Sequence, residues 1–390
     1  MDEKKGNYRQ FMPVTIHFGA GALGELGGIV RKYGKKVLLV TEPWVGWNEK
    51  LLHECKAILE KEGLEVTVFD GVIPNPTTAA VAEAARAGKG AGCQVVVGVG
   101  GGSTMDTAKA AAIEMTHPLP CFEYAYFQPQ QPTAATLPIV LVTTTSGTGS
   151  HVSKCSVVTH SEKGIKTGIV SDFIFAREAI VDPTLMLSMP ADVTAATGFD
   201  VFTHAFESYI NINANPYIDA HAIESIRTVA DALPRAVREG SDRDARVRMT
   251  IADTLAGTCI ANVGTTLPHS LGQPVSGHFP RVSHGGALAM IYPAFMEFSW
   301  KGSIAKFARV ARIFNPRLHR ASDEKAARQS ASVVKAFLQR IGLTDTLRSV
   351  PGVEAKLDVL VKEAMDFPDT FVNPVVPTAD QARQLFLSSM

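Results

Sequence analysis

The sequence predicts an α/β domain with a parallel sheet, followed by an all-helical domain. From residue 36 to residue 182, short runs rich in Val, Ile and Leu alternate with helix-like stretches. That alternation is typical of βαβ units in a parallel sheet. After residue 183 the strand pattern ends, and helical periodicity continues toward the C-terminus.

The length of the chain predicts two domains. It has 390 residues, more than the roughly 250–300 at which a single hydrophobic core usually stops growing. We place the boundary where the strand pattern ends, which gives an α/β domain over residues 1–187 and a helical domain over residues 188–390.

Each expected element has a local signal. The expected strands cover residues 36–41, 65–70, 94–100, 138–145 and 179–182. Amphipathic or Ala-rich segments between them predict helices near residues 48–62, 77–91 and 103–115. A hairpin is expected across Glu162-Lys163-Gly164, and Pro190 followed by Asp192 marks the start of the first long helix of the second domain.

The composition argues for small-molecule chemistry. Lys plus Arg and Asp plus Glu both number 38, which leaves no net field to attract nucleic acid or an anionic membrane. No signal sequence or apolar span of ~18 residues is seen, so we expect a cytoplasmic protein. Five scattered cysteines without a CxxC pair predict reduced core thiols rather than disulfides or a thiolate zinc site.

A glycine run follows the third expected strand and precedes a helix. Gly100, Gly101 and Gly102 let the backbone approach a pyrophosphate, and the helix N-terminus favours its negative charge. Ser103 is expected as the N-cap, with Asp106 completing a capping-box-like pair. The same pattern also fits a tight strand-to-helix turn in which Asp106 acts only as a cap.

Two other segments compete as cofactor loops. Gly19, Gly21 and Gly24 match GxGxxG after a short apolar run, and Glu42 lies near the spacing expected of a ribose-binding acid. Residues 142–153 place small hydroxyl and glycine residues after an apolar strand, where open α/β sheets bind ligands. Neither pattern is specific when taken alone.

Histidines and one carboxylate suggest a metal site. Asp200 and His204 are four residues apart on a helical stretch, which places them on one face. His269, His278 and His284 follow in a Gly- and Pro-rich segment suited to folding back over this pair. Three imidazoles and one carboxylate suit Fe(II), Zn(II) or Ni(II). A surface i,i+4 pair and satisfied structural histidines remain the alternative.

Seven motifs together resemble the iron-containing, group III alcohol dehydrogenase family over nearly the whole chain. They are FGAGAL near the start, GGSTMDTAK (101–109), TTTSGTGS (143–150), KTGIVSD (166–172), DP (182–183), GFDVFTHAFESY (198–209) and the segment from LPH to SHG. The resemblance implies a Rossmann-like first domain and a helical second domain, as in the related dehydroquinate synthase fold.

The resemblance also implies a set of site residues. The catalytic metal, Fe(II) or alternatively Zn(II), would be held by Asp200, His204, His269 and His284. The pyrophosphate of NAD would lie on the loop of Gly101, Gly102 and Ser103, and FGAGAL would be a motif of the fold. The other matching cofactor positions are Asp106, Thr144, Thr145, Thr148 and Lys166.

Three further expectations concern specificity and proton transfer. Glu42 matches the acidic position of NAD-preferring members, where a carboxylate would repel the 2′-phosphate of NADP. Gln273 stands where many members carry a second histidine, so His278 or solvent would relay the proton, and no catalytic residue is assigned. Phe199, Phe202 and Phe279 are candidates for lining a pocket for a small linear alcohol.

The expected activity is hydride transfer between NAD(H) and a small primary alcohol or diol, or the reverse reduction of an aldehyde, in a homodimer or larger homo-oligomer. Maleylacetate reductase-like and glycerol dehydrogenase-like oxidoreductases are the alternatives. A dehydroquinate synthase-like lyase is disfavoured, because the segments 198–213 and 262–286 contain a single arginine, Arg281, for a phosphate-bearing substrate.

Overall fold

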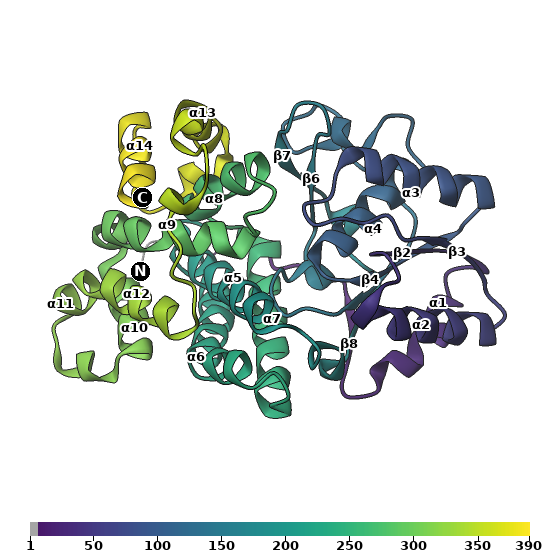
Figure 1. Cartoon of the computed structure of the whole chain (residues 1–390), viewed down its shortest axis with the longest axis horizontal. Coiled ribbons are helices and arrows are strands. Elements are labelled where there is room, and N and C mark those ends of the chain that lie inside the picture. Colours follow the sequence, from purple (N-terminus) through teal and green to yellow (C-terminus); the bar gives the residue numbers. More distant parts are fainter. Residues whose placement is uncertain (1–6) are drawn as a thin grey trace. The chain divides into compact units, whose positions relative to one another are not determined.

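The computed structural model describes residues 7–390 (Figure 1). The chain divides into two compact units: one spans residues 12–188, and the other spans residues 189–390 together with residues 7–11. The amide of Phe11 joins the second unit by donating to Oδ1 of Asn262 at 2.9 Å. No helix within the described range is long and apolar enough to cross a membrane.

The first unit is built on a six-stranded parallel sheet in the order β1-β8-β5-β4-β2-β3. Its strands are β1 (Thr15–Phe18), β2 (Lys36–Thr41), β3 (Glu65–Phe69), β4 (Val95–Gly100), β5 (Ile139–Thr143) and β8 (Glu178–Val181). All five predicted strands are confirmed. The edge strand β1 was not predicted, because four residues with intermediate or exposed side chains carry almost no periodic signal.

The strand order places a topological switch at the centre of the sheet. Strand β2 pairs with both β3 and β4, and the chain leaves β2 toward one edge and β4 toward the other. The carboxyl ends of these two neighbouring strands therefore border a crevice, which is where open α/β sheets bind ligands. Glu42 follows β2 directly, and the glycine run follows β4.

Helices cover both faces of the sheet (Figure 1). On one face, α1 (Leu26–Val30) and α2 (Glu49–Lys61) share a core with Val37, Leu39 and Val97. On the other lie α3 (Thr78–Ala91) and α4 (Gly102–Glu114). A Cβ on Gly98 would lie 2.9 Å from Cβ of Ala108, so glycine in β4 allows α4 to pack close to the sheet.

The predicted hairpin is also confirmed. Strands β6 (Cys155–Thr159) and β7 (Lys166–Val170) form a separate antiparallel pair. All five cysteines are free, and all except Cys155 are buried, as expected for reduced thiols.

The second unit is helical. Its longest helices are α5 (Ala191–Ile210), α6 (Pro216–Arg238) and α7 (Arg243–Val263), and α5 is buried along most of its length. The others are α8 (Leu267–His278), α9 (His284–Ser299), α10 (Ile304–Phe314), α11 (Asp323–Arg328), α12 (Ser330–Arg340), α13 (Leu357–Asp366) and α14 (Ala379–Ser388). A buried central helix can present polar groups to a site without exposing them to bulk water.

Two of the proposed pocket phenylalanines belong to this core instead. Phe199 and Phe202 are completely buried, and both form edge contacts with Tyr292 at centroid distances of 5.3 and 5.6 Å. They stabilise the packing of α5 against α9. The hydrophobic pattern of α5 could not distinguish core from pocket, because apolar side chains are used in both. Phe279 is partly buried against the same core.

Candidate functional site

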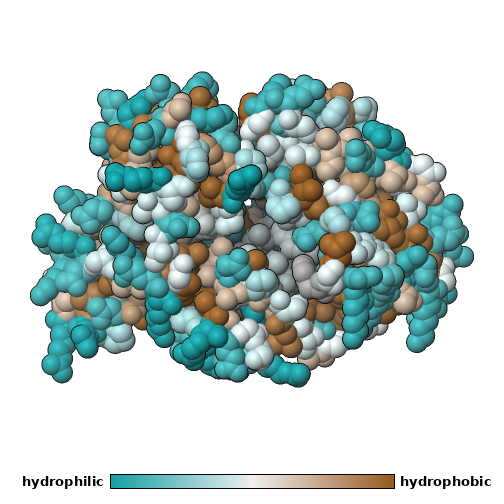
Figure 2. Space-filling model, in the orientation of Figure 1, coloured by the Kyte–Doolittle hydropathy of each residue, from teal (hydrophilic) through white to brown (hydrophobic). Residues whose placement is uncertain are grey.

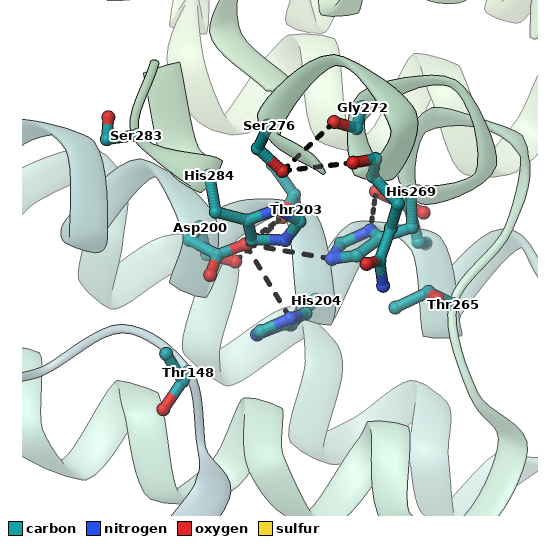
Figure 3. Close-up of polar contacts among 12 residues, drawn as sticks. Thr148, Asp200, Thr203, His204, Thr265, His269, Gly272, Ser276, Ser283 and His284 are labelled. Carbon is teal, nitrogen blue, oxygen red and sulfur yellow. Dashed lines mark hydrogen bonds and ion pairs between the residues drawn. The ribbon is translucent and has the colours of Figure 1, made fainter. Parts of the chain in front are cut away.

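The four predicted metal ligands converge inside the helical unit (Figure 3). Asp200 and His204 lie one turn apart on α5, while His269 lies in the first turn of α8 and His284 is the first residue of α9. Asp200, His204 and His269 are buried, whereas His284 is partly exposed. Three helices therefore direct polar side chains to one point.

Oδ1 of Asp200 is the centre of this cluster. Nε2 of His204 lies 3.6 Å from it. Nε2 of His269 and Nε2 of His284 lie 3.7 and 4.0 Å from the same oxygen. These separations are too long for hydrogen bonds but suit donors that share one ion with bonds of roughly 2.0–2.2 Å.

The buried donor set fits a divalent cation. Nε2 of His269 is buried and has no hydrogen-bond partner within residues 7–390. Asp200, His269 and His284 each present a ligand atom within 4.8 Å of the others. A buried nitrogen without a partner, such as Nε2 of His269, costs free energy unless an ion or a water molecule binds to it. Imidazole and carboxylate donors suit Fe(II) and Zn(II).

Glu207, which the sequence analysis did not single out, orients His269. Its Oε1 lies 2.8 Å from Nδ1 of His269, and its Oε2 accepts from the backbone N–H of Thr266 at 2.9 Å. Burial lowers the pKa of His269, but the carboxylates of Glu207 and Asp200 outweigh that effect and raise it. The negative charge of these two carboxylates also favours a cation bound at Nε2 of His269. Burial raises the pKa of Glu207 itself.

The spacing of Glu207 could have revealed it. It lies seven residues after Asp200 and three after His204, so all three share one face of α5. Thr203 adds a further contact, because its hydroxyl lies 3.0 Å from Oδ1 of Asp200 and 2.8 Å from the Asp200 carbonyl oxygen.

The end of α5 holds the loop that leads into α8. The hydroxyl of Ser208 donates to the carbonyl oxygen of Gly264 at 2.9 Å. Nδ2 of Asn211 donates to the carbonyl oxygens of Val263 and Thr265 at 2.8 and 3.0 Å. These side chains fix the point from which His269 enters the cluster, although none of them is a metal ligand candidate.

A glycine permits the close approach of α9 to α5. A Cβ on Gly285 would lie 2.1 Å from the carbonyl oxygen of Ala196, which is a severe clash with backbone. Ser283 caps the helix by accepting from the N–H of Gly286 at 3.2 Å. The tight packing and the cap together position His284 opposite Asp200.

His278 does not belong to the cluster. It is the last residue of α8, and its Nε2 lies 2.9 Å from Oε1 of Glu363, with Lys356 near its other ring nitrogen. The suggestion that it relays a proton is therefore not supported by its contacts. Gln273 lies one turn after His269 on α8, and its buried Oε1 lacks a hydrogen-bond partner among the described residues.

The glycine loop of the first unit is shaped by close contacts with the loop after β5. A Cβ on Gly101 would lie 3.2 Å from Cγ2 of Thr145, and one on Gly102 would lie 2.4 Å from Cγ2 of Thr148. The amide of Thr144 donates to the carbonyl oxygen of Gly100 at 3.1 Å. The two predicted cofactor loops therefore form one surface at the carboxyl ends of β4 and β5.

The predicted capping box is wrong. Helix α4 begins at Gly102 after Gly101, without a side-chain cap, so Ser103 is already inside the helix. The carboxylate of Asp106 instead accepts from the hydroxyl of Ser150 at 2.7 Å and from the N–H of Val157 at 2.9 Å. Tertiary contacts decided its partners, and Asp106 joins α4 to the loop before β6 and to β6 itself.

The competing GxGxxG segment has a partner of its own. The carboxylate of Asp182 accepts from the N–H of Gly21 at 2.8 Å and from Thr184 at 3.0 Å. It therefore occupies the position that a phosphate would need at this turn. FGAGAL is a structural motif that joins the start of the sheet to the end of β8.

Two further predicted cofactor residues lie in the same unit. Glu42 is partly buried beyond β2, and burial raises its pKa. Lys166, at the start of β7, donates from Nζ to Oδ1 of Asn75 at 2.8 Å. Asn75 has a φ of 57°, an unusual backbone conformation that its short polar side chain tolerates.

The parallel sheet with its glycine loop and the helical unit with its cluster of carboxylate and imidazoles define a metal-dependent, nucleotide-linked oxidoreductase. The comparisons agree with this class. Residues 13–183 match the iron-containing alcohol dehydrogenase model, and residues 194–390 match the C-terminal model of the same family. The chain therefore belongs to the iron-containing alcohol dehydrogenase family, whose members use NAD(H) and a divalent metal.

Relatives in this family act on different alcohols. The chain is 35% identical over 365 residues to choline dehydrogenase of Bacillus subtilis (strain 168), covering 93% of this chain and 90% of the relative. It is 30% identical to NAD-dependent methanol dehydrogenase of Bacillus methanolicus, covering 97% and 99%. A crystal structure of 1,3-propanediol oxidoreductase has a TM-score of 0.91 and 32% identity, covering 98% and 100%.

Proposed function

We propose that this chain is an NAD-preferring, Fe(II)-dependent dehydrogenase of small primary alcohols or diols that also reduces the corresponding aldehydes. The observation that carries the proposal is the convergence of three imidazole nitrogens on Oδ1 of Asp200, in a largely buried cluster where Nε2 of His269 has no hydrogen-bond partner among the described residues. The names of the relatives, which include methanol and 1,3-propanediol enzymes, favour a small alcohol.

The proposed division of work assigns the metal to Asp200, His204, His269 and His284. When bound, a divalent metal supplies a Lewis acid that lowers the pKa of an alcohol oxygen, and the nicotinamide accepts the hydride. Glu207 keeps His269 in one tautomer, with Nδ1 as the donor and Nε2 available as a ligand. The buried carboxylates of Asp200 and Glu207 would balance much of the charge of a divalent ion.

The cofactor is proposed to bind along the surface formed by the loops after β4 and β5. Gly101, Gly102 and Ser103 would face the pyrophosphate at the N-terminus of α4, where backbone N–H groups favour an anion. The other proposed cofactor positions are Glu42, Asp106, Thr144, Thr145, Thr148 and Lys166. Because both oxygens of Asp106 already accept hydrogen bonds, its proposed contribution is to shape the loop.

We also propose that the chain works as a homodimer or larger homo-oligomer. The edge strand β1 supports this, because it leaves Ile16 and Phe18 exposed by 36% and 43% beside unpaired backbone groups. An exposed apolar edge strand favours association with another strand. Light scattering on the purified protein measures the assembly directly, and a monomer at micromolar concentration would contradict the proposal.

The test of the function is anaerobic purification, elemental analysis and an NAD-coupled screen. The substrates are methanol, ethanol, butanol, 1,2- and 1,3-propanediol, 4-hydroxybutyrate and choline, before and after chelation, with Fe(II) or Zn(II) added back. His269→Ala should lose bound metal and turnover together. His278→Ala is the matched control, since it removes a histidine from the same helix but outside the cluster. Full turnover by metal-free protein would contradict the proposal.

A further inference from the structure

The helical unit contains a cavity that is formed by residues other than those of the metal cluster. It has a volume of about 1000 Å³ and is bordered by α6, α10 and α12. Its lining includes four arginines and one histidine against one carboxylate. These residues are Arg227, Arg309, Arg312, Arg340, His319 and Asp231. The cavity therefore carries a strong excess of positive charge, although the chain as a whole carries a net charge of +0.

The acidic groups nearby are already engaged. Asp231 forms an ion pair with Arg248, which does not line the cavity. Arg312 pairs with Asp323 at 2.7 Å. The other three arginines of the lining, Arg227, Arg309 and Arg340, form no ion pair within residues 7–390. The side chain of Arg309 forms a hydrogen bond with Tyr209. Three of the guanidinium groups that line the cavity thus lack an ion-pair partner, and its one carboxylate, Asp231, is paired with Arg248.

The inner wall of the cavity is apolar. Phe314 and Phe337 lie against each other with ring centroids 4.7 Å apart, and Ile313 and Val333 also line this wall. The first turn of α12 contributes Ser332, and a helix N-terminus adds positive potential. The cavity therefore offers cations at its rim and an apolar surface inside. In Figure 2 the exposed surface near α10 and α11 is mainly hydrophilic, with scattered apolar residues.

We propose that this cavity binds a small organic anion that carries a phosphate group on an aromatic or aliphatic body. Guanidinium groups bind phosphate oxygens through paired, charge-assisted hydrogen bonds. An aromatic or aliphatic body would pack against Phe314 and Phe337, so both parts of the ligand find a matching surface. A ligand that binds only the folded protein also stabilises it by mass action.

The probe for this site is phenyl phosphate, which has the required charge and an aromatic body. Binding is measured by titration calorimetry on anaerobic holoenzyme saturated with NADH, so that the dinucleotide loop is already filled. We expect phenyl phosphate to bind at least about tenfold more tightly than inorganic phosphate, because inorganic phosphate leaves the apolar wall uncovered. Raised NaCl concentration should weaken both ligands.

The critical variant is the double substitution Arg227→Gln with Arg340→Gln. Both side chains are exposed, so the protein should fold, and loss of two charge-assisted contacts should weaken phenyl phosphate binding by at least about tenfold. The matched control, Arg243→Gln with Arg348→Gln, removes two exposed charges outside the cavity and should leave binding unchanged. Dehydrogenase activity should persist in both variants, since neither touches the metal cluster.

The thermal midpoint distinguishes a binding role from a structural one. Without ligand, the Arg227→Gln, Arg340→Gln protein should keep the Tm of the wild type, because both side chains are exposed and form no ion pair among the described residues. It should lose the Tm increase that phenyl phosphate causes. Equal affinity in wild type and this variant, or no binding to wild type at millimolar concentration, would overturn the proposal.

Discussion

Replacing Glu207 with glutamine tests whether a buried carboxylate that hydrogen-bonds to the proposed ligand His269 controls metal affinity. In the native protein its two oxygens accept from Nδ1 of His269 and from the N–H of Thr266. Glutamine has the same shape but a single acceptor oxygen, so one of these donors must face an NH₂ group. An unsatisfied buried donor costs about 1–3 kcal/mol.

The effect on the metal should be larger than the effect on the fold. Loss of a carboxylate that orients a ligating histidine typically weakens metal binding by about 10–100-fold, which equals about 1.4–2.7 kcal/mol. The assay is anaerobic competition of wild-type and Glu207→Gln protein with a chromophoric chelator for Fe(II) and Zn(II). Circular dichroism confirms that both proteins are folded.

Ser208→Ala is the matched control for this experiment. Ser208 is the next residue on α5 and is equally buried, but its hydroxyl bonds to the carbonyl oxygen of Gly264 rather than to a ligand. The control should lose about 1 kcal/mol of stability and keep its metal affinity. If Glu207→Gln binds metal within twofold of wild type, or if Ser208→Ala loses as much affinity, the orienting role of Glu207 is refuted.

Three other predictions address packing, specificity and pH. Gly285→Ala should lower the free energy of unfolding by about 1–3 kcal/mol and weaken metal binding, because its Cβ would lie 2.1 Å from the carbonyl oxygen of Ala196. Chemical denaturation measures the loss. The control is Gly90→Ala, at a position on α3 where a Cβ meets open space, and it should be neutral or stabilising. Glu42→Ser should raise kcat/KM for NADP relative to NAD at least about tenfold, and a wild-type enzyme that prefers NADP would contradict the premise. Burial lowers the pKa of His151 from 6.5 to about 3, so between these values the unfolded chain binds a proton that the folded protein does not, and stability falls as pH falls. Wild type should lose about 2 kcal/mol more than His151→Leu between pH 6.5 and pH 5, and parallel stability curves for the two proteins would exclude this linkage.

The regular elements could be predicted because their signals are local. The buried strands β2, β4 and β5 are continuous apolar runs, which is how a parallel sheet covered on both faces reads in sequence. Strand β1 escaped prediction because it is a short edge strand whose side chains are mostly accessible. The start of α4 was predicted too late in the sequence, because Asp106 was expected to form a capping box with Ser103. The helix begins at Gly102, and the Asp106 carboxylate accepts from Ser150 and Val157 instead.

The sequence by itself determined the α/β and helical parts of the chain, the family resemblance and the identity of Asp200, His204, His269 and His284 as candidate ligands. Each of these is carried by periodicity or by a contiguous motif. The tertiary structure alone decided that Asp106 joins α4 to the loop before β6 and to β6, that Glu207 stands behind His269, and that Phe199 and Phe202 belong to the core. The arginine-lined cavity is likewise invisible in sequence, because helices distant along the chain contribute its walls. Hydrogen-bond partners and cavity walls depend on which distant residues meet, and a one-dimensional pattern does not contain that information.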